Sequence, residues 1–314
     1  PLRAGKSAGQ LTKEGAWLLD PTGKLQPGAL MAPPEGDAGT GMVATNAVRK
    51  RTGNISVGTS AFSMNVLDAP LKAVHRDIDI VTTPDGAPVA MVHTNNCSSD
   101  LNAWVQLFGE FAELIGHGQT PAKLYRTLFE VSQRADRDAG GLLNYSCLSG
   151  ENITDVETGR PLFVRAPHSH MNLANFMLAQ LYGCFAPLKI GMDILVKEEG
   201  VQTDVMIAQG GLFKTPVIGQ QVLADCLGLP ITVMETAGEG GPWGMAVLAV
   251  FAKWHGEKAL ADFLDDEVFH NPESSTLLPT EEGRLGCQKF IAAYRAGLTV
   301  EREAGKAVAD PADA

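Results

Sequence analysis

Residues 203–216 read Thr-Asp-Val-Met-Ile-Ala-Gln-Gly-Gly-Leu-Phe-Lys-Thr-Pro. The apolar run that ends at two glycines is typical of a buried strand, and Thr215-Pro216 favours the start of a helix that Gly228 would end. Ligands of α/β proteins bind at the carboxyl ends of strands, so Gly210-Gly211 lies where a nucleotide could bind. The pattern is weak alone, because glycines also let a strand and a helix pack closely.

Strands and helices alternate on both sides of this stretch. The predicted strands are Ile55–Val57, Phe62–Val66, Val89–His93 and Ile231–Met234, and Leu142–Leu148 is predicted to be a loop or a strand. The predicted helices are Leu11–Leu19, Ser99–Ile115, Pro121–Arg137, a helical pair within Ser169–Val196 with a break at Pro187, Thr215–Leu227, and an apolar helix that follows Gly238-Glu239-Gly240-Gly241-Pro242 and ends at Trp254. This alternation predicts an α/β protein.

Charge and hydropathy exclude two function classes. The chain has 314 residues, 45% of them apolar, and a net charge of −11. This charge argues against nonspecific binding of nucleic acid, which requires a basic face. The most apolar stretch, Leu173–Val196, contains Lys189, Asp193 and Pro187, so we predict a buried helix rather than a membrane span.

The five cysteines lie far apart and form no C-x-x-C pair. Their spacing suggests neither a zinc site nor a disulfide framework, and the simplest interpretation is a reduced, cytoplasmic protein. The pattern of a signal peptide is not recognised in these residues, and from the start at Pro1 in a segment with no beginning of its own we expect a fragment.

Two further glycine turns could hold a ligand. Gly36-Asp37 would place a carboxylate beside a close backbone approach, although an Asx-turn or a helix cap is the simpler interpretation. Gly58-Thr59-Ser60, between two predicted strands, would offer N–H and hydroxyl groups to an anion, although it could be an ordinary hairpin. His168 and His170 could share a face toward a metal, but no third ligand is evident and a surface role is the simpler interpretation.

The order of these turns resembles the C-terminal half of the FGGY family of carbohydrate kinases, from about Gly9 to the end of the chain. The motifs that carry the resemblance are Gly36-Asp37, Gly58-Thr59-Ser60, Leu148-Ser149-Gly150-Glu151, Gly210-Gly211-x-x-Lys214-Thr215-Pro216 and Gly241-Pro242-x-Gly244-x-Ala246. Bacterial xylulokinases carry residues similar to Gly191-Met192-Asp193 and Leu223-Ala224-Asp225.

The resemblance implies a ribonuclease-H-like, actin-like ATPase domain at residues 34–314. Residues 1–33 would connect it to a missing N-terminal sugar-binding domain. Asp37 matches the general base, which binds the sugar hydroxyl and removes its proton. The β- and γ-phosphates would contact Gly58, Thr59 and Ser60, and the adenosine would lie against Gly210, Gly211 and Thr215. ATP and Mg²⁺ are the implied cofactors, with Mg²⁺ held by phosphate and water rather than by dedicated side chains.

We therefore expect ATP-dependent phosphorylation of a sugar hydroxyl, with a ketopentose such as xylulose as the acceptor. The alternative is a catalytically incomplete, nucleotide-binding half that needs a separate N-terminal domain or a partner chain. This alternative is supported by two differences between the chain and the family. Nothing in the chain matches the G-I-D-x-G-T motif with which family sequences open, and Asn152 replaces an Arg. Leu212 and Phe213 replace small residues, which predicts either a narrower adenosine pocket or an altered nucleotide preference. Family members are often oligomers, so a homo-oligomer is another expectation.

Overall fold

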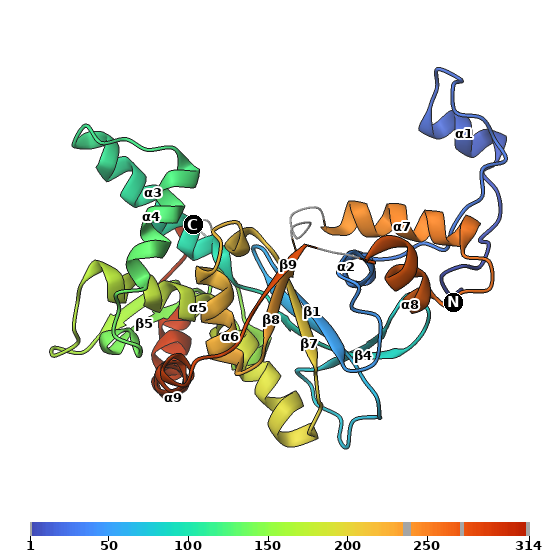
Figure 1. Cartoon of the computed structure of the whole chain (residues 1–314). Coiled ribbons are helices and arrows are strands. Elements are labelled where there is room, and N and C mark those ends of the chain that lie inside the picture. The colour runs from blue at the N-terminus through green and yellow to red at the C-terminus, as the bar shows by residue number, and fades with distance from the viewer. Residues whose placement is uncertain (1, 235–239, 271–272, 312–314) are drawn as a thin grey trace.

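The computed structural model describes residues 2–234, 240–270 and 273–311. It centres on a seven-stranded sheet of order β3-β4-β2-β1-β7-β8-β9 (Figure 1). The strands are β1 (Thr52–Val57), β2 (Ala61–Val66), β3 (Asp79–Thr82), β4 (Pro88–Thr94), β7 (Val205–Gly210), β8 (Ile231–Met234) and β9 (Ser274–Leu277). The β1–β7 and β7–β8 pairs are parallel and the other pairs are antiparallel. A second, two-stranded sheet pairs β5 (Leu142–Tyr145) with β6 (Leu162–Arg165).

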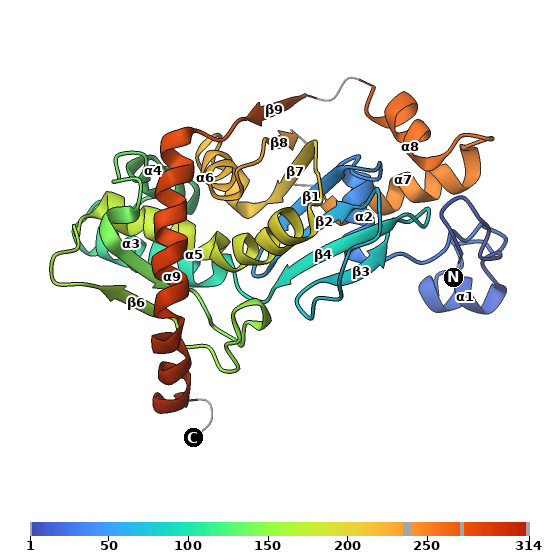
Figure 2. The ribbon, with the colours of Figure 1, turned by 90° about the horizontal axis from the view of Figure 1, so that it is seen from below.

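Helices cover both faces of the large sheet (Figures 1 and 2). The helices are α1 (Lys13–Leu19), α2 (Asp37–Ala44), α3 (Ser98–Leu114), α4 (Pro121–Ser132), α5 (Leu173–Asp193), α6 (Ile218–Leu227), α7 (Gly240–Trp254), α8 (Leu260–Phe263) and α9 (Glu281–Ala307). One core packs α2, α7 and α8 against Met64 and Val66 of β2. The other core packs α3 to α6 and α9 against Ile55 and Val57 of β1. The predicted α/β fold is thereby confirmed, with a helix layer on each side of the sheet.

The predicted strands agree well with the observed ones. Ile231–Met234 is β8 residue for residue, and Ile55–Val57 and Phe62–Val66 lie within β1 and β2. These strands were recognisable because β-branched and apolar residues alternate with turn residues at their ends. Helix α3 begins at Ser98, one residue before the predicted start.

The predicted break at Pro187 is wrong. Helix α5 runs unbroken from Leu173 to Asp193 with Pro187 inside it, and a π-helix follows over Ile194–Glu199. A proline cannot donate to the carbonyl four residues earlier, here that of Gly183. The Ser146 hydroxyl donates to the Gly183 carbonyl instead (3.4 Å). A side chain from another segment therefore satisfies the group that the proline leaves free.

Other helix boundaries also differ from the prediction. Helix α4 ends at Ser132 rather than at Arg137. In its last turn the Ser132 hydroxyl donates to the Phe129 carbonyl (2.6 Å). Helix α6 begins at Ile218, since Val217 has a positive φ of 73° that no helix accepts. Gly238 and Glu239, predicted to precede α7, lie outside the described residues.

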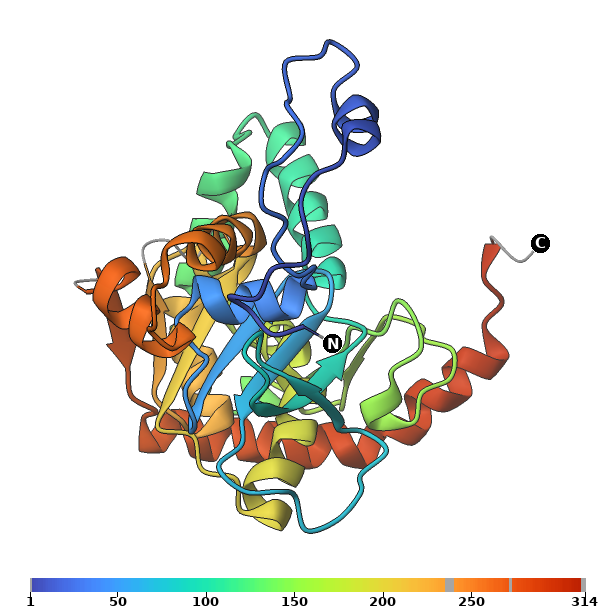
Figure 3. The ribbon, with the colours of Figure 1, turned by 90° about the vertical axis from the view of Figure 1, so that its right-hand side faces the viewer.

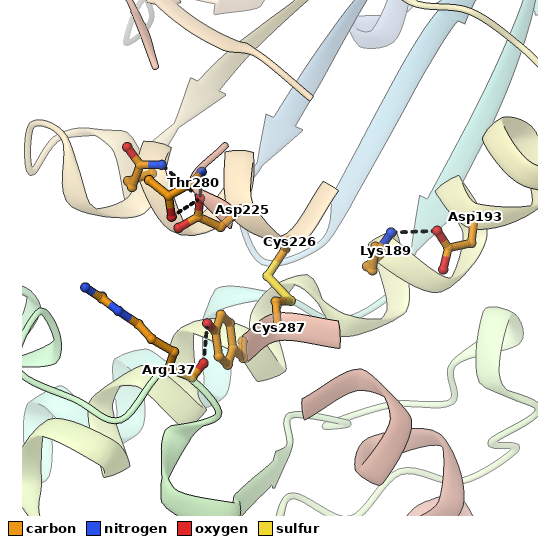
Figure 4. Close-up of a disulfide and its surroundings, with 9 residues drawn as sticks. Arg137, Lys189, Asp193, Asp225, Cys226, Thr280 and Cys287 are labelled. Atoms are coloured by element: carbon orange, nitrogen blue, oxygen red, sulfur yellow. Dashed lines mark hydrogen bonds and ion pairs between the residues drawn. A yellow bond between two sulfur atoms is a disulfide. The ribbon is translucent and has the colours of Figure 1, made fainter. Parts of the chain in front are cut away.

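The expectation that all cysteines are reduced is wrong for one pair. Cys226 of α6 and Cys287 of α9 form a disulfide with a Cα–Cα distance of 5.3 Å (Figure 4). They are 61 residues apart in sequence, and only the packing of α9 along α6 brings them together. Cys97, Cys147 and Cys184 are free and buried.

Residues 8–31 form an extended arm that projects from the domain (Figure 3), whereas the Ala4 amide donates to the Pro84 carbonyl of the domain (2.8 Å). A bridge between Gln10 and Leu30 closes the arm into a loop that carries α1. Trp17, Leu18 and Leu19 of α1 are exposed. Within the described ranges, no helix is both long enough and apolar enough to cross a membrane.

Candidate functional site

The Gly58-Thr59-Ser60 turn joins β1 to β2 as a tight hairpin. The Gly58 amide donates to the Ser60 carbonyl (2.8 Å), while Gly58 and Thr59 are exposed. Residues at the start of α3 hold the turn through hydrogen bonds to its carbonyl groups. There the Cys97 amide donates to the Thr59 carbonyl (2.8 Å) and the Ser98 hydroxyl donates to the Gly58 carbonyl (2.6 Å). The turn is thus held by its carbonyl groups at an end of the sheet.

Gly210-Gly211 lies next to this turn because β1 and β7 are parallel and Val57 pairs with Gly210. Gly210 has a φ of +119°, and a Cβ there would lie 1.9 Å from the Val57 carbonyl oxygen. Only glycine fits at such a position. A Cβ on Gly211 would meet nothing within 4 Å, so its backbone faces open space. The structure therefore brings the two predicted turns together at the carboxyl ends of adjacent strands.

A cavity of about 320 Å³ opens beside Gly211 and Thr215. Its other wall is the α3–α4 pair, where the Tyr125 hydroxyl donates to Asn102 Oδ1 (2.7 Å) and burial raises the pKa of Tyr125. The remaining lining residues are Ser98, Ala122, Arg126, Phe129, Leu212 and Lys214. Arg126 and Lys214 bring positive charge to a cavity that also carries exposed backbone and hydroxyl groups, a set of groups that suits a phosphorylated ligand.

Gly210 faces a different, larger cavity of about 630 Å³, lined also by Phe213, Val217 and residues of β8 and β9. Lys214 lines both cavities. Only the smaller one contains Ser98, which is bonded to the Gly58-Thr59-Ser60 turn. The smaller one is therefore our candidate nucleotide cavity.

Asp37 lies at the start of a helix that the sequence analysis did not predict. It is the first residue of α2, with Gly36 as the N-cap, and its Oδ1 accepts from the Ala38 amide (2.8 Å). Helix α2 was missed because small residues dominate its sequence. A carboxylate in the first turn suits the positive end of the helix dipole. The helix-cap interpretation of Gly36-Asp37 thus holds, and the Asp37 carboxylate is exposed.

The Asp37 side chain borders a cavity of about 410 Å³ on the other side of the Gly58-Thr59-Ser60 turn. Ser60 and His93 line the same cavity, which has an apolar floor of Phe62, Met64, Val81 and Met91. Helix α7 fixes the position of α2, since a Cβ on Gly244 would lie 1.9 Å from the Thr40 carbonyl oxygen. The Gly241-Pro242-x-Gly244 motif therefore acts in helix packing beneath Asp37.

Several residues around these cavities escaped the sequence analysis. Ser98, Asn102, Tyr125 and Arg126 line the nucleotide cavity, but they carry no motif of their own. Glu151 of the predicted Leu148–Glu151 motif is fully buried and accepts hydrogen bonds from Asn95 and Asn96. From the sequence, Asn95-Asn96 is most simply a turn, although the pair could line a phosphate site, and the structure bonds both residues to Glu151.

Other candidates lie elsewhere. His170 Nδ1 is 2.6 Å from Asp136 Oδ2, and neither residue lines any of the three cavities described above. In the described part of the chain, no group of three or more His, Cys, Asp or Glu side chains is placed to hold a metal ion.

The fold has close counterparts among solved structures of sugar and polyol kinases. Xylulose kinase from Lactobacillus acidophilus matches with a TM-score of 0.75 at 18% identity, covering 96% of this chain and 58% of that one. Gluconate kinase from Lactobacillus acidophilus matches with a TM-score of 0.73 at 18% identity, covering 97% and 58%. Glycerol kinase from Plasmodium falciparum, solved with ADP, matches with a TM-score of 0.70 at 13% identity, covering 95% and 55%. The domain is thus an actin-like ATPase fold.

The model of the FGGY family of carbohydrate kinases, C-terminal domain, matches residues 53–253, more than half of the chain. The chain therefore belongs to the FGGY family of carbohydrate kinases. No curated protein sequence matches it. The chain spans less than two thirds of the length of the solved kinases that it resembles.

Proposed function

We propose that this chain is the catalytic and nucleotide-binding part of an ATP-dependent sugar kinase whose acceptor is a ketopentose such as xylulose. The observation that carries the proposal is the position of the Gly58-Thr59-Ser60 turn between two cavities. Ser60 lines the cavity of Asp37, and Gly58 is bonded to Ser98 of the cavity that holds Gly211 and Thr215. A kinase needs its phosphate-binding groups between the donor and the acceptor.

Each predicted residue has a role in this reaction. Gly211 and Thr215 bind the adenosine of ATP through exposed backbone and a hydroxyl group, with Gly210 setting the backbone path. Gly58, Thr59 and Ser60 hold the β- and γ-phosphates. Asp37 removes the proton from the sugar hydroxyl, whose oxygen then attacks the γ-phosphorus while the bond to ADP breaks. The donors fit a phosphate chain better than a protein-held metal, and Mg²⁺ bound to the phosphates would neutralise their charge.

We call the cavity beside Asp37 the acceptor cavity. Its lining suits a substrate that has an apolar edge next to the reactive hydroxyl. Its floor is formed by Phe62, Met64, Val81 and Met91, and its polar side chains are those of Glu35, Asp37, Ser60, Thr82 and His93. Sugars present CH faces and hydroxyl edges, and such a lining can bind both. The preference for xylulose rests on the local likeness to xylulokinases and on the xylulose kinases among the similar folds.

The test is sugar-stimulated release of ADP by the chain, across ketopentoses, hexuloses, gluconate and glycerol. Asp37→Asn keeps the acceptor oxygen for the Ala38 amide, so it should leave the helix start and ATP binding intact. We expect it to lower kcat by about 10²–10⁴-fold, the usual contribution of a general base. Equal turnover by wild type and Asp37→Asn would exclude the role of Asp37.

A second candidate function is a nucleotide-binding half that needs a separate N-terminal domain or a partner chain. The observation in its favour is that the chain covers only 55–58% of the three kinases named above. In this case the chain alone binds ATP but shows no stimulation by any sugar. Adding the missing domain would restore turnover. The ligands of the proposed kinase are a sugar and ATP, its proposed state is a homo-oligomer, and its proposed location is the cytoplasm.

A further inference from the structure

Glu151 is a buried carboxylate that the proposed reaction does not use. Its side chain is fully excluded from solvent. One oxygen, Oε2, accepts from the amides of Asn95 (2.9 Å) and Asn96 (3.1 Å) and from Asn96 Nδ2 (3.1 Å). Burial raises the pKa of Glu151, and the hydrogen bonds from Asn96 and Asn95 oppose this rise because they favour the charged form. Glu151, which lies 55 positions after Asn96 in the sequence, thus holds the segment that precedes α3.

The Asn96 side chain makes the connection reciprocal. Its Oδ1 accepts from the Ser149 amide (3.0 Å) and hydroxyl (3.2 Å), and its Nδ2 donates to the Gly150 carbonyl (3.3 Å). Asn96 is itself buried. Residues 95–96 and 149–151 therefore form one hydrogen-bonded unit, which we call the Asn96–Glu151 clamp.

The next two residues of the chain hold the phosphate-binding turn. The Cys97 amide donates to the Thr59 carbonyl, and both the amide and the hydroxyl of Ser98 donate to the Gly58 carbonyl (3.2 and 2.6 Å). These bonds engage the carbonyl groups of the turn and leave its outer face to a ligand. Any shift of residues 95–96 is passed directly to Gly58 and Thr59.

We propose that Glu151 is a positioning residue, which acts through Asn95 and Asn96 to hold the Gly58-Thr59-Ser60 turn where it meets the terminal phosphates of the nucleotide. This inference rests on the proposed function. A positioning role predicts one effect on nucleotide binding that a purely structural role does not. Loss of the clamp should weaken contacts with the β- and γ-phosphates while the adenosine contacts, made across the nucleotide cavity by Gly211 and Thr215, persist.

The experiment compares the affinities of the chain for ATP and AMP by calorimetry. In Glu151→Ala, the buried backbone amide of Asn96 and the partly buried amide of Asn95 lose their acceptor. We expect ATP affinity to fall about tenfold or more, and AMP affinity to stay within about twofold. Glu151→Gln keeps an uncharged acceptor, so its ratio of ATP to AMP affinity should lie between those of wild type and Glu151→Ala. The matched control is Glu301→Gln, another fully buried carboxylate that accepts from a backbone amide (Arg160, 2.8 Å) but has no bond to the clamp.

Each possible result of this experiment either supports or overturns the positioning role of Glu151. An unchanged ratio of ATP to AMP affinity in Glu151→Ala, or an equal loss in Glu301→Gln, overturns the positioning role. Should Glu151→Ala fail to fold, a wild-type ratio in Glu151→Gln overturns it. Failure of the proposed function is seen separately, because wild type itself would then bind neither nucleotide, and the inference would fall with it.

Discussion

Replacing Gly210 by alanine tests the geometry that joins the two nucleotide turns. At a φ of +119° and a ψ of −177°, the backbone occupies a region used almost only by glycine, which costs another residue about 1–3 kcal/mol. The added Cβ would also lie 1.9 Å from the Val57 carbonyl oxygen, so β7 must move away from β1 at their paired ends. We expect Gly210→Ala to lower the free energy of unfolding by about 3 kcal/mol or more.

Gly211→Ala is the matched control, one residue along the chain. Its Cβ would meet nothing within 4 Å, so the change in stability should stay within about 0.5 kcal/mol. Urea unfolding measures both variants, and Gly210→Ala should also lower Tm by roughly 6 °C or more. Gly211 lines the nucleotide cavity, so Gly211→Ala should weaken ATP binding without loss of stability. Equal stabilities of the two variants would refute the close approach of Gly210 to Val57.

The remaining predictions concern buried groups around α9. Burial raises the pKa of Glu301 to about 7, so its protonated form is favoured by folding, and stability should decrease as the pH rises from about 4.5 to about 7. Glu301→Gln should flatten this dependence in urea unfolding at a series of pH values, and an unchanged slope would contradict the assignment. Alkylation of the denatured, unreduced chain should find three free thiols, and reduction of the 61-residue Cys226–Cys287 link should lower stability by about 4 kcal/mol. Five free thiols in protein alkylated during cell lysis would instead show that this pair is reduced in its compartment.

Sequence patterns predicted strands better than helix boundaries. Strand β8 was predicted to the residue because its apolar run is flanked by Pro230 and a glycine-rich stretch. The unbroken helix α5 could not be predicted, since the hydroxyl that satisfies the Gly183 carbonyl comes from Ser146 on a different segment. The expectation that a proline breaks a helix rests on neighbouring residues alone, whereas the hydroxyl that compensates for the proline comes from a distant part of the chain.

The candidate site was predicted in part. The glycine turns and Asp37 were predicted from the order of the motifs and its resemblance to a known family. Among Gly36, Gly58, Gly210 and Gly211, only Gly210 has a positive φ and a close approach that restrict its residue type. The α3–α4 wall could not be predicted, since Asn102 and Tyr125 are ordinary polar residues on helix surfaces until the fold places them opposite Gly211. The disulfide was missed for a similar reason, as spacing in sequence carries no information on which helices pack together.

Local patterns in the sequence are enough to predict the alternation of strands and helices and the glycines at which a ligand could approach the backbone, and the order of the motifs indicates the family. The local patterns depend on short-range periodicity and on the steric limits of single residues. The adjacent strand ends of the Gly58 and Gly210 turns, the helix that begins at Asp37 and the contact of Glu151 with Asn96 become visible only in the folded chain. Register, helix packing and buried hydrogen bonds join residues far apart in the chain, and each depends on the whole core being formed.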